Sequence, residues 1–226
     1  MSYAANPVAW DDDSVPFPAN LGLTWWDCLT SPDRFFSRLS WEGSFARPIL
    51  YYLIVAILGG MLSLFWFVWG PWGVANQLGL KLEWQLLIFF LTPFAVLLAL
   101  GLATSIQHLF VLMLAPERRG FGATATVFCY SSGVGLLTAV LPPAIGFGAA
   151  PGGLFGSFYL VVYSMLALSV QLWYVAVLVF GMRRAHSTTT GRALAIVLLP
   201  IGVGFALALG LAIVAAALIA LAELPV

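Results

Sequence analysis

Long uncharged apolar blocks constrain this chain more than any other feature of its sequence. Of its 226 residues, 62% are hydrophobic and only 8% are charged, whereas a soluble domain carries charge on roughly a quarter of its residues. The blocks reach about 20 residues or more, enough for a helix to cross a hydrocarbon core of roughly 30 Å. Runs such as AVLLAL and ALALGLAIVAAALIALA do not alternate, as the strands of a membrane barrel must. The sequence therefore predicts an all-α, polytopic membrane protein.

Prolines, glycines and charges divide the apolar sequence into five predicted transmembrane spans. The second block is too long to cross upright as one straight helix. Pro93 predicts a kink that leaves 94–114 as the span and 84–91 along the membrane interface, and one long tilted helix is the alternative. The predicted spans, within a five-helix domain over 47–222, are 48–69, 84–114, 123–141, 155–182 and 193–221.

Two segments precede the first span. Residues 1–23 hold three consecutive aspartates and three prolines, which predict a disordered acidic tail. Residues 24–46 predict a short amphipathic helix that starts at Ser31, a capping residue followed by proline and aspartate. We expect this helix to lie in the headgroup layer, and packing on the protein's own spans is the alternative. The predicted membrane-interface anchors are Trp25, Trp26, Phe35, Phe36 and Leu39.

The basic residues predict an orientation. All nine Lys and Arg residues except Lys81 fall on one side of the five predicted spans. The positive-inside rule then places the N-terminus in the cytoplasm and the C-terminus outside. The arginines predicted to make contacts on the cytoplasmic side of the spans are Arg118, Arg119, Arg183, Arg184 and Arg192.

A short loop at 116–120 joins the second and third predicted spans and gathers polar residues around it. The loop forces the two spans to pack antiparallel, so polar residues on either side of it lie at similar depth. Polar groups at that depth are costly unless they are paired, so they meet each other or a ligand. We predict a neutral His108 hydrogen-bonded to a polar group on the third span, with headgroup binding or a pH switch as the alternative. The predicted polar cluster comprises Gln107, His108, Tyr130, Ser131 and Gln171.

Small residues recur at every fourth position of the last apolar block. They form a stripe that predicts the close approach of another helix, from the same chain or from a second copy. The sequence leaves the oligomeric state open. The stripe comprises Gly204, Ala208, Ala212 and Ala216.

Several kinds of chemistry are missing from the sequence. No Asp or Glu lies within a predicted span, which argues against a proton- or cation-coupled transporter. No metalloprotease or serine-hydrolase motif occurs, and two histidines alone do not make a metal-ligand set. The formal net charge of zero provides no basic field for nucleic acid. We therefore expect no enzyme activity, no cofactor and no metal.

An ordered set of motifs resembles the Yip1-domain family. The segments SPDRFFSRL and RPILYY are followed by His108 before a basic glycine turn, then by Tyr130-Ser131, and finally by GRALAIVLLP. The resemblance covers roughly 25–221 and implies a five-span membrane protein with a cytoplasmic N-terminus. Eukaryotic relatives act at Golgi and endoplasmic-reticulum membranes and bind Rab-type small GTPases. The short tail lacks an Asp-Leu-Tyr-Gly-Pro-like segment, which makes a Rab-type GTPase a doubtful partner and favours a bacterial-type member in the inner membrane.

The sequence is compatible with two functions. The first is a non-enzymatic membrane scaffold or adaptor that contacts the lipid bilayer and a membrane or cytoplasmic protein. The second is a small transporter, or the membrane subunit of one, that handles a lipid or an apolar compound. A water-filled cavity lined by Gln107, His108, Tyr130 and Gln171 would favour the transporter, whereas a dry bundle in which these groups bond to each other would favour the scaffold.

Overall fold

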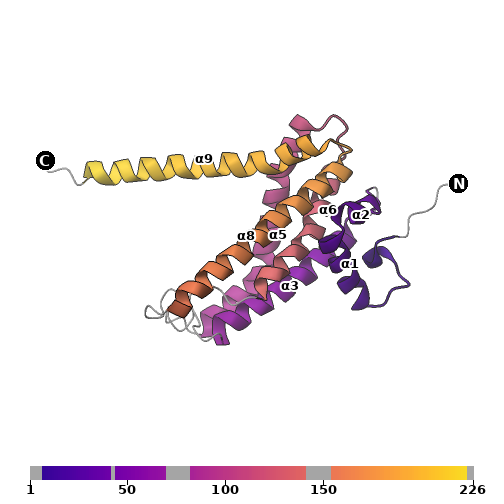
Figure 1. The fold of residues 1–226 in the computed structure, drawn as a ribbon, viewed down its shortest axis with the longest axis horizontal. Helices are drawn as coiled ribbons and strands as arrows, with labels where there is room; N and C mark the ends of the chain where they lie inside the picture. Colours follow the sequence, from indigo (N-terminus) through magenta and orange to yellow (C-terminus); the bar gives the residue numbers. More distant parts are fainter. Residues whose placement is uncertain (1–6, 42–43, 70–81, 141–153, 223–226) are drawn as a thin grey trace.

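The computed structural model describes residues 7–41, 44–69, 82–140 and 154–222, and every regular element in these ranges is helical (Figure 1). This confirms the predicted all-α class. The elements are η1 (Ala9–Asp11), α1 (Ala19–Thr30), α2 (Pro32–Ser37), α3 (Ala46–Trp69), α5 (Leu82–Leu114), α6 (Phe121–Ser131), η2 (Ser132–Gly135), α7 (Leu136–Ala139), α8 (Leu154–Ala185) and α9 (Thr190–Ala222).

Four helices in the described ranges are long and apolar enough to cross a membrane. They support a multi-pass membrane protein, but they do not confirm the predicted count of five spans. The four candidate spans are Ala46–Trp66, Phe90–Leu114, Phe158–Ala185 and Thr190–Ala215.

The predicted third span is not one continuous α-helix. It consists of α6 with 11 residues, η2 with 4 and α7 with 4, and its predicted last residue lies outside the described ranges. The tighter 3-10 turn falls at Gly133, where neighbouring side chains leave no room for a Cβ atom. Such an atom would lie 2.6 Å from the Tyr51 hydroxyl and 2.8 Å from the Trp25 ring. The glycine thus allows close packing at the point where the helix changes its winding.

α6 lies at the centre of the bundle and packs against α3, α5 and α8. Most of its residues are buried. Hydrogen bonds bring the end of α8 to the α5–α6 loop, through His186 and Arg119, and bring the start of α3 to the N-terminal segment, through Arg47 and Trp10. The start of α3, the α5–α6 loop and the end of α8 lie at one end of the bundle. We call it the basic end, because most of the arginines lie there, among them Arg47, Arg119 and Arg184.

α5 continues through Pro93 without a break. The expected division into an interfacial piece over 84–91 and a span over 94–114, and the alternative of one long tilted helix, both concern the position in the membrane and stay predictions. A proline removes one backbone donor, and a helix tolerates this where its neighbours support it.

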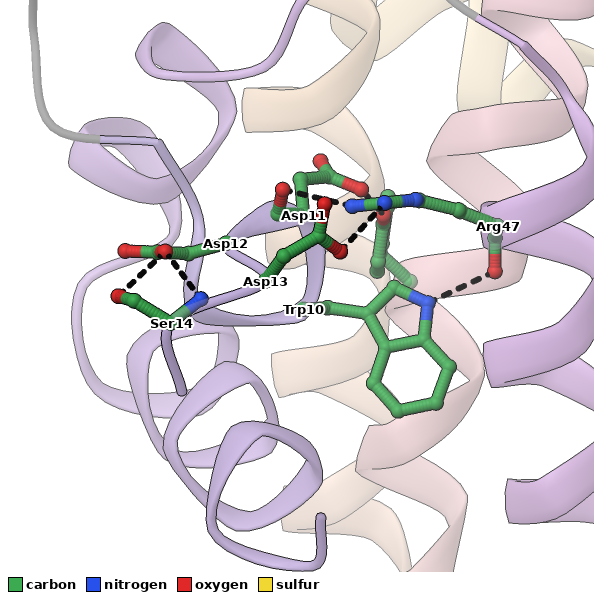
Figure 2. Close-up of polar contacts among 7 residues, drawn as sticks. Trp10, Asp11, Asp12, Asp13, Ser14 and Arg47 are labelled. Carbon is green, nitrogen blue, oxygen red and sulfur yellow. Dashed lines mark hydrogen bonds and ion pairs between the residues drawn. The ribbon is translucent and has the colours of Figure 1, made fainter. Parts of the chain in front are cut away.

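The N-terminal segment from residue 7 is packed against the bundle rather than disordered. Val8 and Trp10 are buried. The Trp10 backbone N–H donates to Thr24 Oγ1 at 2.9 Å. Its indole N–H donates to the Arg47 carbonyl at 2.9 Å (Figure 2). The disordered tail predicted for 1–23 is thus wrong for the part that the structure describes, because these apolar anchors offset the cost of ordering the chain.

α2 faces the protein and not the membrane. Phe35 and Phe36 are fully buried and Leu39 nearly so, because α2 packs on α8. The interfacial position predicted for these three side chains is wrong, and packing on the protein's own helices, the alternative, is correct. Trp25 is half-buried and donates its indole N–H to the Gly133 carbonyl at 2.7 Å. Trp26 remains 57% exposed, so its role as a membrane anchor stays a prediction.

α9 leaves the bundle after its first turns. Ala193, Ile196 and Val197 are buried against α5 and α8, whereas every side chain over 201–215 is exposed. Figure 1 shows α8 and α9 diverging from their shared connection. Gly204, Ala208 and Ala212 therefore lie on an exposed part of the helix, and the side chain of Ala216 lies outside the described part. The helix-packing role of this stripe stays a prediction.

Candidate functional site

Polar side chains from α5, α6 and the end of α8 form a hydrogen-bonded chain at the basic end. His108 Nδ1 lies 2.9 Å from Thr124 Oγ1, and Thr124 Oγ1 lies 3.0 Å from His186 Nε2. The backbone N–H of Arg119 lies 3.2 Å from His186 Nδ1. The contact between His108 and Thr124 is the hydrogen bond to the third predicted span that the sequence predicted for His108.

The Arg119 amide fixes the tautomer of His186. A backbone N–H can only donate, so His186 Nδ1 must accept and the ring proton must sit on Nε2. That proton is donated to Thr124 Oγ1, and the tautomer of His108 sets the direction of the bond between Thr124 and His108 Nδ1. His186 is therefore held as a neutral imidazole between two fixed partners.

Burial holds the pKa of His186 well below its ordinary value of 6.5, at about 4. His186 is fully buried, and removal from water disfavours the charged form. The neighbouring His108 ring and Arg119 lower the pKa further by repulsion. Sequence reasoning missed His186 and Thr124, because both meet His108 only once α8 and α6 have packed together.

The other predicted members of the polar cluster do not join this chain. Gln107 donates to the Ile196 carbonyl on α9. Tyr130 lies in an aromatic group, with ring centroids 5.2 Å from Phe35 and 5.1 Å from Tyr51.

Two predicted members remain apart from the hydrogen-bonded groups. Ser131 is buried, and its hydroxyl has no hydrogen-bond partner within the described ranges. Gln171 is exposed on α8, so its predicted place in the cluster is wrong. A glutamine in the middle of a long apolar helix does not reveal from sequence which face it occupies.

The arginines of the basic end mostly bind within the protein. Arg184 contacts Asp33 with its Nε at 2.8 Å and its Nη2 at 2.6 Å, and Arg183 binds the same carboxylate. The pKa of Asp33 is lowered to about 2. The hydrogen bond from Arg184 is the largest cause, and the hydrogen bond from Arg183 lowers the pKa further. These two arginines hold α2 on the end of α8, and their predicted contacts on the cytoplasmic side stay a prediction.

The three remaining predicted arginines differ from one another. The Arg119 guanidinium lies 5.7 Å from the centre of the Trp41 ring. Arg118 is exposed and donates to the Leu112 carbonyl at 2.9 Å. Arg192 is exposed at the start of α9. Arg118 and Arg192 therefore keep the accessibility that a contact with a partner requires.

A cleft of about 460 Å³ lies between α3, α7 and α8, away from the basic end. Its wall includes the polar side chains of Tyr52, Ser63, Thr138 and Tyr163. None of the residues of the predicted polar cluster lines it. No sequence pattern indicated this cleft, because its polar residues are spread over three helices.

A comparison of the sequence with known families identifies the family of the chain. A model of the Yip1 domain matches residues 26–221, most of the chain. The chain belongs to the Yip1 family. The matched region of this Yip1-domain protein begins in α1 and ends in α9, so it includes the hydrogen-bonded chain, the end of α1 and all of α2. No curated protein and no solved structure matches the chain.

Proposed function

We propose that this Yip1-domain protein is a non-enzymatic membrane scaffold or adaptor. The observation that carries the proposal is the pairing of the polar groups beside the α5–α6 loop. His108, Thr124 and His186 bond to each other, and Gln107 bonds to a backbone carbonyl. Groups satisfied in this way stabilise the packing of helices and are not presented to a substrate in a water-filled path.

A second observation favours a rigid contact surface at the basic end. α1 and α2 are fixed to the bundle by the indole of Trp173, which donates to the Leu29 carbonyl at 3.0 Å, and by the pairing of Asp33 with Arg184. A surface fixed before binding loses little entropy when a partner docks on it. The proposed partner is a membrane or cytoplasmic protein, and the lipid bilayer surrounds the apolar helices.

The proposal includes a location and an orientation. We propose a bacterial inner membrane, with the basic end and the N-terminus in the cytoplasm and the C-terminus outside. The positive-inside rule supports this orientation, because the arginines gather at one end of the bundle. A docked partner would then meet exposed arginines of that end, among them Arg34 and Arg192.

Charge reversal at the two ends of the bundle tests the scaffold function. The variant Arg34→Glu/Arg192→Glu reverses two exposed charges at the basic end, and Glu83→Lys reverses an exposed charge at the start of α5 as the matched control. Quantitative co-purification from isotopically labelled membranes should show a set of proteins that the double variant loses several-fold and the control retains.

Two outcomes would count against the scaffold function. One is the same set of co-purified proteins from all three chains. The other is uptake or lipid movement that depends on the purified protein in vesicles, which would instead support the transporter hypothesis.

A further inference from the structure

A second cleft, of about 290 Å³, opens at the basic end between the N-terminal segment, residues 38–41 and 44–48, and α6. Its wall carries both signs of charge. Asp11 comes from the N-terminal segment, Arg38 follows α2, and Arg47 lies in the first turn of α3. Ser44 and Tyr130 add hydroxyl groups to the same wall. Figure 2 shows Asp11 and Arg47 side by side in this region.

The Asp11 carboxylate is poorly compensated for its burial. The Tyr130 hydroxyl donates to it across a long 3.5 Å. Arg47 does not neutralise it directly, because its Nη1 donates to the Asp11 backbone carbonyl at 2.6 Å and its Nη2 pairs with Asp13 at 2.7 Å. Burial accordingly raises the pKa of Asp11, against the attraction of Arg47. A half-buried carboxylate with one weak hydrogen bond is a suitable acceptor for a ligand ammonium.

The two arginines of the cleft have donors to spare. The pair between Arg47 and Asp13 is exposed, with the Asp13 side chain 90% accessible, and such pairs contribute little and exchange readily. Arg38 binds Asp27 through Nη2 at 2.5 Å. Its buried Nε has no hydrogen-bond partner in the part of the chain that the structure describes. A guanidinium offers five N–H donors, and a phosphate is the anion that best uses them.

The position of the cleft favours a lipid headgroup. Arg47 and Pro48 lie in the first turn of α3, and Gly122 lies in the first turn of α6, so the cleft sits where these helices leave the apolar region. Trp41 also lines it, and tryptophan is typical of the headgroup level of a membrane.

The pattern of charge selects among headgroups. A phosphoglycerol group has no cation for Asp11. A phosphocholine group has a cation but no N–H to donate. A phosphoethanolamine group carries both a phosphate and an ammonium with three N–H donors. We propose that this cleft binds phosphoethanolamine, with the ammonium on Asp11 and the phosphate on Arg47 and Arg38. The group can come from a phospholipid of the surrounding leaflet or from a soluble glycerophosphoethanolamine.

Two variants and two controls test the site. Asp11→Asn removes the acceptor charge, and Asp12→Asn is its control, because Asp12 lies outside the cleft and its carboxylate bonds only to Ser14 among the described residues. Gly122→Leu fills the cleft from a position where an added Cβ atom meets nothing within 4 Å. Gly191→Leu is its control, since the Cβ atom there is equally free.

The measurement is native mass spectrometry of the full chain in detergent, after incubation with equal amounts of phosphatidylethanolamine, phosphatidylcholine and phosphatidylglycerol. We expect one molecule of phosphatidylethanolamine to stay bound, with an affinity about tenfold higher than that of either other lipid. One charge-assisted hydrogen bond contributes a preference of about this size. Both cleft variants should lose this preference, and both controls should keep it.

A titration with glycerophosphoethanolamine, from an amount equal to that of the lipid up to an excess, distinguishes the two sources of the group. Displacement of the lipid at similar concentration would assign the soluble compound, and retention would assign the lipid. Equal retention of all three lipids by the wild-type chain, or an unchanged preference in both Asp11→Asn and Gly122→Leu, would overturn the site.

Discussion

His186 makes the stability of this protein depend on pH. Its ring is buried between the Arg119 amide and the Thr124 hydroxyl, and it faces a second titratable ring, that of His108. Burial holds its folded-state pKa at about 4, whereas an unfolded chain has an ordinary histidine pKa of about 6.5. The unfolded state therefore binds the proton more readily between these two values.

The sign of the effect follows from this difference. Stability is fully present above about pH 6.5 and falls as the pH drops toward 4, because protons then favour the unfolded state. The loss is on the order of 3 kcal/mol. Thermal unfolding in detergent at a series of pH values should show it, and His186→Gln should flatten the curve in that window. An equally steep curve for His186→Gln would show that other groups cause the dependence.

The same residues show which part of the polar site can be predicted from the sequence. The need for a partner for His108 follows from the cost of a polar group at membrane depth, so it is predictable. The identity of the partners is not predictable, because Thr124 and His186 meet His108 only through the rotation of α6 and α8 about their axes. That rotation is set by side-chain packing and leaves no local pattern in the sequence.

Among the helices, the crossing of α8 with α2 and α6 depends on one glycine. A Cβ atom at Gly181 would lie 2.4 Å from Val127 Cγ1 and 3.0 Å from Phe36 Cζ. We expect Gly181→Ala to destabilise the protein by about 1–3 kcal/mol, because overpacking outweighs the gain in helix propensity. Thermal unfolding followed by circular dichroism measures the change.

Gly202 in α9 provides the matched control. It also lies within a helix, and an added Cβ atom there meets nothing within 4 Å. Gly202→Ala should leave the stability unchanged or raise it by up to about 1 kcal/mol. A Gly181→Ala protein as stable as Gly202→Ala would show that the three helices can separate slightly without cost.

α2 shows why an element can be predicted while its environment is not. Its start after Ser31, with proline at the first helical position, follows the pattern that the sequence indicated. Its apolar face was assigned to the membrane, yet Phe35 and Phe36 pack on the protein. An apolar stripe has the same sequence whether lipid or protein covers it, so periodicity alone cannot distinguish the two.

The whole molecule is predicted to cross the membrane five times, and this count can be tested. The loop after α5 and the end of α8 lie at the same basic end, and the chain leaves that end again in α9. We therefore expect reporter fusions after Glu117 and after Val226 to lie in opposite compartments, with the first in the cytoplasm. Reporters in the same compartment would contradict the predicted five passes.

The apolar blocks predict the class of the protein because their length and their lack of alternation can be read directly from the sequence. The shape of the bundle depends on contacts that no local pattern contains. α6 is interrupted by a 3-10 turn where Gly133 meets Trp25 and Tyr51, and α9 is exposed beyond its first turns. Both features result from contacts between distant parts of the chain.

The packing of α1 and α2 on the bundle also orders the events of biosynthesis. Trp25 bonds to Gly133, Leu29 to Trp173 and Asp33 to Arg184, across separations of 108, 144 and 151 residues. The ribosome thus delivers the first member of each pair long before the second. The contact of α1 with Gly133 can therefore form before α8 is made, whereas the contacts of Leu29 and Asp33 can form only after the C-terminal half of α8 has been synthesised.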